Sequence, residues 1–213
     1  MIVANLKQLK EDVPAAVNVV AVSKTKPIDA IQQAYEAGHL DFGENKVQEL
    51  CQKHETLPKD IRWHMIGHLQ RNKVKYIAPF VHLIHGVDSE RLLNEINKQG
   101  AKNNRVIDVL LQIHIAEEST KFGFSYAEAE AILSKAKTLE NVRITGLMGM
   151  ASYTDNNAQL TSEFSGLQDF YNKHQASNNW TTLSMGMSND YKLAVSLGST
   201  MIRVGSLIFG SRN

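Results

Sequence analysis

The sequence predicts an α/β fold, a single (β/α)8 TIM-type barrel, on the basis of three observations. Short segments rich in β-branched residues alternate with segments of helical spacing, which is typical of a parallel sheet covered by helices. Eight such repeats favour a closed barrel over an open doubly wound sheet. A length of 213 residues, with no linker or low-complexity tract, suits one domain. We therefore expect residues 1–213 to form one barrel domain, with an open sheet as the alternative.

The expected strands are short apolar runs, of which the second and the seventh are the weakest. They lie at 17–23, 40–43, 61–66, 81–87, 106–115, 142–148, 180–184 and 201–204. Between them, apolar residues recur at intervals of three or four, as in helices that cover a sheet. The helices are expected at 28–38, 45–56, 69–78, 89–103, 126–140, 157–176 and 189–197, with a short final helix after residue 205.

Residues suited to helix ends support these boundaries. Asp88 or Ser89 is a suitable N-cap for the helix at 89–103. Gly38, Gly100 and Gly198 stand where helices are expected to stop.

Composition and charge exclude several classes of protein. The formal net charge is +1 with both signs interspersed, so there is no electrostatic basis for binding nucleic acid or a membrane surface. Cys51 is the only cysteine, which excludes an intrachain disulfide and a thiolate metal cluster. The N-terminus lacks a signal-peptide core, and no segment reaches the roughly 18 apolar residues of a membrane span. We expect a cytoplasmic protein with no membrane association.

The first strand ends in two lysines, Lys24 and Lys26, just before Pro27. Because side chains alternate along a strand, Val20, Val22 and Lys24 share one face. If that face lines the barrel, Lys24 points into the mouth, where such barrels carry their chemistry. A partly desolvated lysine there can form a Schiff base with a carbonyl. Alternatively, Lys24 caps the strand and extends to water. Lys26 is interpreted as a solvated loop lysine, and a second amine at the same mouth is the alternative, because its position in the alternation matches that of Lys24.

Two strand-to-helix turns near the C-terminus have the features of a phosphate site. LSMGMSND leads into a helix for which Ser188 is a suitable N-cap, and IRVGS leads into a helix opened by Gly205 and Ser206. Helix N-termini present unpaired N–H groups, and many barrels bind phosphate after strands seven and eight. Ordinary turns capped by serines are the alternative interpretation.

Arg203 lies inside the last expected strand, on the same face as Met201 and Gly205. An arginine inside a barrel cannot lose its charge and must find a partner. Either a structural ion pair or a ligand near Lys24 would satisfy this requirement.

Other polar clusters carry weaker signals. His64 and His68 are four residues apart, a spacing that binds metals on a helix. In a strand this spacing corresponds to about 13 Å, so we expect no metal site. Lys121 in the loop at 116–124 is interpreted as solvated, and Glu44 either pairs with a lysine of the site or forms a structural ion pair.

The sequence contains six long motifs between about residue 15 and the end: AVSKTKP, FGENKVQE, WHMIGHLQRNK, GLMGM, LSMGMSND and GSTMIRVGSLIFG. Together they resemble the pyridoxal phosphate homeostasis proteins (the YggS/PROSC family), which are related to the N-terminal domain of alanine racemase. The resemblance implies a (β/α)8 barrel that binds pyridoxal 5′-phosphate (PLP). The segment before the first strand is shorter than in the family, so we expect a truncated N-terminal helix.

The resemblance also implies cofactor-binding roles for eight residues, and a catalytic role for none. Lys24 matches the lysine that holds PLP as a Schiff base, and Arg203 matches the arginine that faces the pyridine nitrogen. The phosphate cradle corresponds to Ser188, Gly205 and Ser206. The positions that line the cofactor cavity correspond to Asn45, His64 and Met148.

The implied function is that of a carrier rather than a catalyst. A cation beside the ring nitrogen disfavours its protonation, whereas many PLP enzymes pair this nitrogen with a carboxylate. The chain also has no room for the second domain that supplies an opposing acid/base in alanine racemase. We expect a monomeric carrier and buffer in intracellular PLP homeostasis, with apo forms of PLP-dependent enzymes as acceptors. A weak PLP-dependent amino-acid racemase and a Schiff-base aldolase acting on a phosphorylated sugar are the alternatives.

Overall fold

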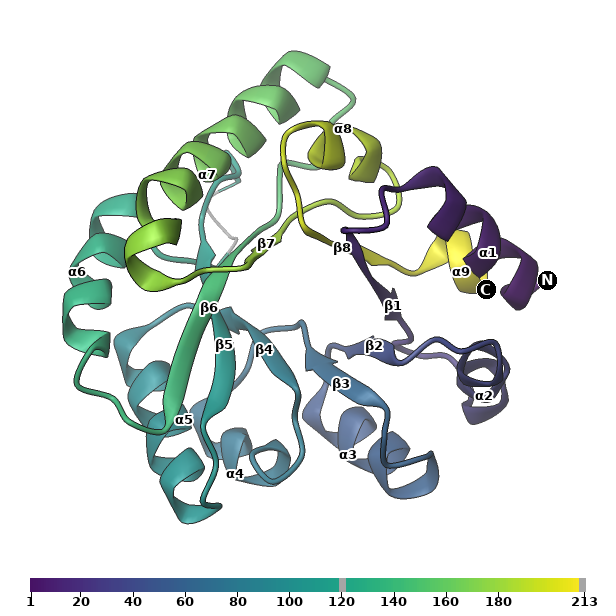
Figure 1. Ribbon diagram of the computed structural model, residues 1–213, viewed down its shortest axis with the longest axis horizontal. Coiled ribbons are helices and arrows are strands. Elements are labelled where there is room, and N and C mark those ends of the chain that lie inside the picture. Colours follow the sequence, from purple (N-terminus) through teal and green to yellow (C-terminus); the bar gives the residue numbers. More distant parts are fainter. Residues whose placement is uncertain (119–121, 211–213) are drawn as a thin grey trace.

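The structure, a computed structural model, describes residues 1–118 and 122–210, so Lys121 lies outside the described residues. Eight parallel strands form a closed barrel in which each strand pairs with the next and β8 pairs with β1. The strands are β1 (Asn18–Val22), β2 (Asp41–Glu44), β3 (Arg62–Met65), β4 (Leu83–Val87), β5 (Ile107–Ile113), β6 (Val142–Gly149), β7 (Thr182–Ser184) and β8 (Met201–Val204). The closed ring confirms the (β/α)8 prediction and excludes the open sheet (Figure 1).

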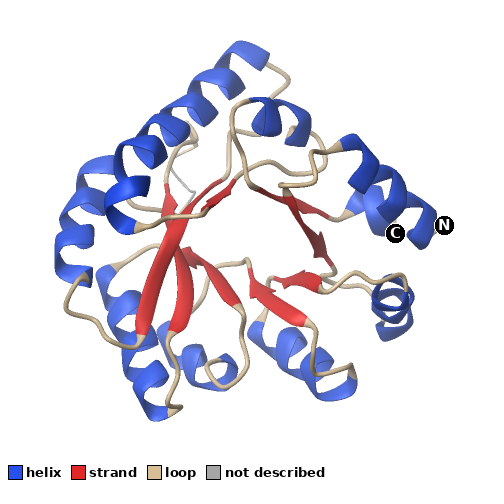
Figure 2. Cartoon of the chain, viewed as in Figure 1, coloured by secondary structure: helices blue, strands red, loops and turns tan. Residues whose placement is uncertain are grey.

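Helices form an outer layer around this ring (Figure 2). They are α1 (Ile2–Asp12), α2 (Ile28–Glu36), α3 (Val47–Thr56), α4 (Val74–Ile77, preceded by a 3-10 turn at Arg71–Lys73), α5 (Glu90–Lys102), α6 (Tyr126–Ala136), α7 (Asn157–Asn178), α8 (Tyr191–Ser196) and α9 (Ser206–Phe209). None of the described helices has both the length and the apolar character that crossing a bilayer requires.

The N-terminal helix α1, which was expected to be truncated, is 11 residues long and buries Leu6 and Leu9. It lies beside α9, and the side-chain amide of Asn5 donates a hydrogen bond to the carbonyl oxygen of Ile208 (3.0 Å). The first and last helices of the described chain are therefore neighbours (Figure 1).

Side chains alternate between the barrel interior and the layer beneath the helices. Val19 and Ala21 of β1 belong to the large core beneath the helices. Val20 instead packs inside the barrel, in a small cluster with Leu83, Leu110, Met148 and Met201. Val20 also pairs in register with Arg203 of β8. The face of β1 that carries Val20 therefore lines the barrel interior, which is the condition under which Lys24 was expected at the mouth.

Of the helix ends expected at Ser89, Gly38, Gly100 and Gly198, three are confirmed and one is wrong. Ser89 is the N-cap of α5, and Gly38 and Gly198 have positive φ just after α2 and α8. Gly100, however, lies inside α5, which continues beyond it. A Cβ atom there would lie 2.9 Å from the carbonyl oxygen of Arg105, so this glycine permits a close approach between chain segments rather than ending the helix.

Candidate functional site

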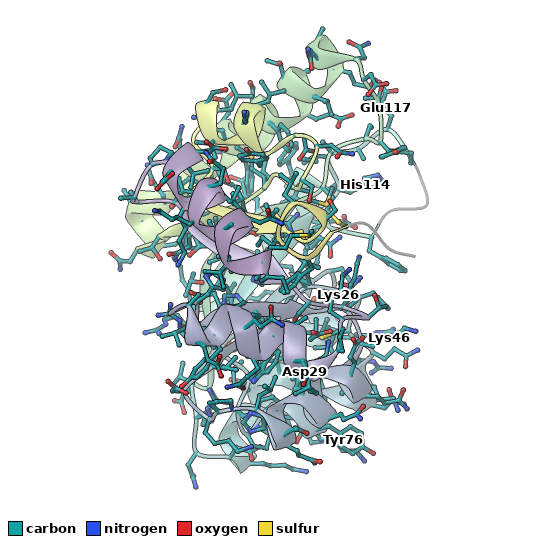
Figure 3. All side chains as sticks on the ribbon, turned by 90° about the vertical axis from the view of Figure 1, so that its right-hand side faces the viewer. Lys26, Asp29, Lys46, Tyr76, His114 and Glu117 are labelled. Atoms are coloured by element: carbon teal, nitrogen blue, oxygen red, sulfur yellow. The ribbon has the colours of Figure 1, made fainter. Side chains whose placement is uncertain are left out.

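A pocket of about 570 Å³ opens at the end of the barrel where the strands have their carboxyl ends. Its volume is typical of small-molecule sites, and its lining comes from the ends of β1, β2, β3, β6, β7 and β8 and the segments that follow them. Figure 3 shows Lys26, Lys46 and His114, which follow β1, β2 and β5, on one side of the molecule. The pocket therefore lies where (β/α)8 barrels carry their chemistry.

Six of the eight residues expected to bind a ligand line this pocket. They are Lys24, Asn45, Ser188, Arg203, Gly205 and Ser206. The fold thus brings the first and last parts of the chain together around one pocket.

The other two expected residues, His64 and Met148, lie deeper in the barrel and do not line the pocket. The residues two positions later on the same strand faces, Ile66 and Met150, line it instead. Two residues along a strand correspond to about 6–7 Å. His64 and Met148 were expected to line the cavity, but this pocket is lined by the next residues on the same strand faces, nearer its mouth.

Lys24 lies just beyond β1, in a turn that hydrogen bonds hold on both sides. The Ser23 hydroxyl donates to Oε1 of Glu44 (2.6 Å), and the backbone N–H of Thr25 donates to Oε1 of Glu49 (2.6 Å). Thr25 has a φ of 64°, a conformation that is uncommon for residues other than glycine. The two residues that flank Lys24 are therefore each hydrogen-bonded to a glutamate side chain, one from β2 and one from α3.

Lys53, buried on α3, connects these two glutamates. Its Nζ donates to Oε1 of Glu44 (2.7 Å), to Oε1 of Glu49 (2.7 Å) and to the carbonyl oxygen of Ser23 (2.8 Å). Burial raises the pKa of Glu44, and the charge of Lys53 opposes this rise. Of the two roles expected for Glu44, the structure shows the structural ion pair.

Lys26 lines the same pocket but is not simply a solvated loop lysine. Its Nζ donates to the carbonyl oxygens of Phe209 (3.3 Å) and Gly210 (3.2 Å). The side chain is half-buried and connects the loop after β1 to the end of α9.

Two turns on the pocket wall present backbone N–H groups. Among the described residues, the backbone N–H groups of Ser188, Asn189 and Ser206 have no hydrogen-bond acceptor. All three residues line the pocket. Clustered backbone N–H groups of this kind can bind an anion.

The first of these turns is closed differently from the prediction. The N-cap of α8 is Asp190, so the expectation that Ser188 caps this helix is wrong. The Asp190 carboxylate accepts a hydrogen bond from the backbone N–H of Met187 (2.6 Å). This bond closes a turn over 187–190, in which Ser188 belongs to the pocket wall rather than to the helix.

Arg203 borders the pocket and is only 4% exposed. Its Nη1 donates to Oγ of Ser184 (2.6 Å) and its Nη2 donates to the carbonyl oxygen of Gly149 (3.0 Å). Burial lowers its pKa to about 10, and the negative charge of Asp190 opposes this effect. The side chain is therefore a cation at neutral pH. Its guanidinium has five N–H groups, and the two hydrogen bonds just named use two of them.

The segment 150–157, which follows β6, was not predicted to belong to the site, yet it forms much of the pocket wall. Ser152 anchors it, because its backbone N–H and hydroxyl donate to the two carboxylate oxygens of Glu163 (2.7 and 2.6 Å). Tyr153 lines the pocket although its side chain is 89% exposed. The sequence ASYTDNN carries only the signal of an ordinary turn-rich loop.

At the opposite end of the barrel, Asp41, His64 and His82 form the one group among the described residues with metal-like spacing, their ligand atoms within 4.8 Å of one another. Both oxygens of Asp41 and both ring nitrogens of His64 are already engaged in hydrogen bonds. These bonds account for the cluster without a metal ion.

The family model described as "Alanine racemase, N-terminal domain" matches residues 1–213 of this chain. The chain is 39% identical over 197 residues to a protein of Aquifex aeolicus named "Pyridoxal phosphate homeostasis protein", a match that covers 91% of this chain and 86% of that protein. A protein of the same name from Escherichia coli strain K12 is 34% identical over 230 residues, with coverage of 98% and 96%.

The fold is also similar to that of PipY from Synechococcus elongatus PCC7942. The structure of PipY with PLP bound has a TM-score of 0.90 and 36% identity, and the match covers 99% of this chain and 100% of PipY. The structure of PipY without PLP has a TM-score of 0.94.

Proposed function

Because the chain belongs to the pyridoxal phosphate homeostasis proteins, within the alanine racemase N-terminal domain family, we propose that it holds PLP on Lys24 as a carrier and buffer without catalytic turnover. In this proposal it acts as a cytoplasmic monomer and supplies apo forms of PLP-dependent enzymes. One observation carries the proposal. A single pocket combines a lysine, a buried cation and three backbone N–H groups that find no acceptor within residues 1–118 and 122–210.

The pocket fits PLP on three counts. Its volume of about 570 Å³ accommodates a small aromatic ligand. The backbone N–H groups of Ser188, Asn189 and Ser206, which have no acceptor among the described residues, can donate hydrogen bonds to a phosphate dianion. Arg203 provides a positive charge for the pyridine nitrogen of the ligand.

Bound PLP supplies an aldehyde that condenses with an amine, giving a C=N bond and releasing water. Lys24 provides this amine, and the hydrogen bonds donated by the Ser23 hydroxyl and the Thr25 N–H hold the turn from which it extends. Arg203 donates to the pyridine nitrogen and, as a cation, keeps that nitrogen unprotonated. The N–H groups of the two turns bind the phosphate through charge-assisted hydrogen bonds.

Turnover would require a second acid/base held opposite Lys24. Tyr153 is the tyrosine that lines the pocket in the described part of the chain, and 89% of its side chain is exposed. A group so open to solvent does not form the water-excluded site on which electrostatic catalysis depends. A weak racemase that uses Tyr153 is the second candidate function.

The Lys24→Ala variant tests the attachment. It should lose the near-visible absorption of lysine-bound PLP and the PLP that borohydride traps, while circular dichroism shows an intact fold. Lys46→Ala, which removes an exposed lysine at the same end of the barrel, is the matched control and should trap PLP normally. Trapping at the full level in Lys24→Ala, with the adduct on Lys26, would show that the wrong lysine was chosen.

A pair of assays separates the carrier from the racemase. The loaded wild-type protein should reactivate an apo PLP-dependent enzyme, and it should not exchange the α-hydrogen of common amino acids for deuterium. Exchange at enzyme-like rates of about 1–1000 per second, lost in both Lys24→Ala and Tyr153→Phe, would favour the racemase.

A further inference from the structure

Five buried polar side chains, each from a different strand, form a line of hydrogen bonds across the barrel interior beneath the pocket. Nη1 of Arg203 donates to Oγ of Ser184 (2.6 Å), which lies 3.2 Å from Nδ1 of His85. Nε2 of His85 lies 3.0 Å from Nδ1 of His64, and Nε2 of His64 lies 3.0 Å from Oδ1 of Asp41. The five exposed fractions range from 0% to 9%, so water does not compete for these contacts.

The two ends of the line fix its direction. A guanidinium group can only donate, so Ser184 accepts at the contact with Arg203. At the other end, burial would raise the pKa of Asp41, but hydrogen bonds from His64 and Arg62 outweigh burial and lower it to about 2. Asp41 is therefore a carboxylate, which can only accept, and Nε2 of His64 donates to it.

The two contacts in the middle have three possible solutions. In the first, Nε2–H of His85 donates to Nδ1 of His64, and the Ser184 hydroxyl donates to Nδ1 of His85. In the second, His64 carries a hydrogen on both nitrogens, and Nδ1–H of His85 donates to Ser184. In the third, His85 carries a hydrogen on both nitrogens and donates to both His64 and Ser184. In the second and third, Ser184 would face two donors, and its own hydrogen would have no acceptor among the described residues. Only the first solution gives every hydrogen one acceptor.

We propose that Ser184 and His85 are positioning residues for Arg203, and that the hydrogen bonds run in one direction from Arg203 through Ser184, His85 and His64 to Asp41. An isolated buried guanidinium would be costly, and this line links it to a buried carboxylate without a direct ion pair. The inference rests on the proposed function in one respect, which is that Arg203 faces the pyridine nitrogen of PLP.

The first test uses the ligand-free wild-type protein. Nitrogen chemical shifts of 15N-histidine-labelled protein distinguish protonated from unprotonated ring nitrogens. We expect both His64 and His85 to be neutral, with the hydrogen on Nε2 and none on Nδ1. The His85→Gln variant assigns the His85 signals. A hydrogen on Nδ1 of His85 would overturn the proposed direction, whether or not the protein binds PLP.

The second test measures positioning through ligand affinity. In His85→Leu the hydroxyl hydrogen of Ser184 loses its acceptor, so Oγ is no longer held in the orientation in which it accepts from Arg203. Arg203 is then less well positioned, and PLP should bind roughly tenfold more weakly. The affinity for a PLP analogue with CH in place of the ring nitrogen should fall by less than about twofold, because its ring cannot accept a hydrogen bond from Arg203. His85→Gln, whose amide accepts and donates as the imidazole does, should restore most of the PLP affinity.

The outcomes separate this proposal from the proposed function. An equal loss for PLP and the analogue in His85→Leu would mean a general structural effect and would refute positioning. No loss for either ligand would refute it as well. Failure of the wild-type protein to bind PLP would contradict the proposed function, while the ring-nitrogen shifts would still decide the direction of the line.

Discussion

At the scale of single residues, the turn that carries Lys24 depends on two buried charges that do not touch the pocket. Glu44 is fully buried, and Lys53 is 4% exposed. A buried ion pair contributes little net stability while it is intact, but removal of one partner leaves a charge without compensation. Lys53 also donates to the carbonyl oxygen of Ser23, so its loss should affect both stability and the position of Lys24.

We expect Lys53→Met to lower the free energy of unfolding by about 3–5 kcal/mol and to slow the attachment of PLP to Lys24. The double variant Lys53→Met/Glu44→Leu should regain much of the stability but not the attachment rate, because the bond to Ser23 remains lost. Urea unfolding and the growth of the near-visible absorption measure the two effects. Attachment at the wild-type rate in the double variant would show that Lys53 has no role in placing Lys24.

The low pKa of Asp41 predicts a specific dependence of stability on pH. The pKa of the Asp41 carboxyl falls from its ordinary value of 3.8 to about 2 in the folded protein. A depressed carboxyl pKa contributes stability above the unfolded value, and this contribution is lost as the pH falls from about 4 to about 2. The difference in free energy of unfolding between wild type and Asp41→Asn should therefore be constant at neutral pH and shrink through this range. A difference that is independent of pH between 6 and 2 would show that Asp41 is not held as a carboxylate.

The sequence was a better guide to which strands line the pocket than to how far along each strand the lining residues lie. Alternation along a strand was sufficient to place Lys24 and Arg203 at one pocket. The family resemblance, which implied His64 and Met148, did not distinguish them from Ile66 and Met150. The height of the barrel mouth on each strand depends on strand tilt and stagger. The partners of buried polar groups, such as His85 and Ser184, come from strands far apart in the sequence, and no local pattern pairs them.

At the scale of elements, the strand-to-helix connection after β7 shapes the proposed phosphate side of the pocket. Gly186, which precedes the turn at 187–190, has a φ of 97°. A Cβ atom there would lie 2.7 Å from Cβ of Ala194 in α8 and 3.0 Å from Cα of Tyr191. The short distance between the turn and α8 therefore requires glycine, and the glycine of this motif was visible in the sequence although the N-cap was not.

We expect Gly186→Ala to destabilise the protein by more than the roughly 1–2 kcal/mol that a left-handed alanine costs, because α8 must also move. The displaced turn should weaken PLP binding more than binding of pyridoxal, which lacks the phosphate. Gly38→Ala is the matched control, since Gly38 has a φ of 81° and no atom within 4 Å of its Cβ position. Isothermal titration with both ligands provides the measurement. Equal losses for PLP and pyridoxal would argue against a phosphate site at this turn.

At the scale of the whole molecule, the order of the strands could be predicted from the sequence. The hydrogen bonds between polar side chains inside the barrel could not. Eight alternating repeats predicted the ring, and their boundaries agree with the structure within a few residues. The ring closes by pairing β1 with β8, and the proposed ligand contacts lie on both sides of this seam. Lys24 follows β1, whereas Arg203 and Ser206 belong to β8 and α9. A bound ligand should therefore stabilise the closure of the barrel.

We expect one cooperative unfolding transition, as a single domain over residues 1–213 requires, and a higher Tm when PLP is bound. A ligand at one hundred times its Kd contributes about 2.7 kcal/mol, which corresponds to a rise of roughly 5–10 °C for a chain of this size. Lys24→Ala should show a smaller rise, because only the noncovalent contacts remain. Scanning calorimetry measures both values. Two separate transitions would contradict the single domain, and an unchanged Tm with PLP would contradict ligand contacts across the seam.

The seam between β1 and β8 also has a consequence for the order of events during protein synthesis. The ribosome delivers Arg203 only after Lys24 and the 178 residues between them, on the order of ten seconds or more later at ordinary elongation rates. Because β1 can pair with β8 only after both have left the exit tunnel, a nascent chain exposes the lysine before it can complete the pocket. Stable capture of the aldehyde should therefore begin only when β8 has emerged, so that loading with PLP reports the closure of the barrel.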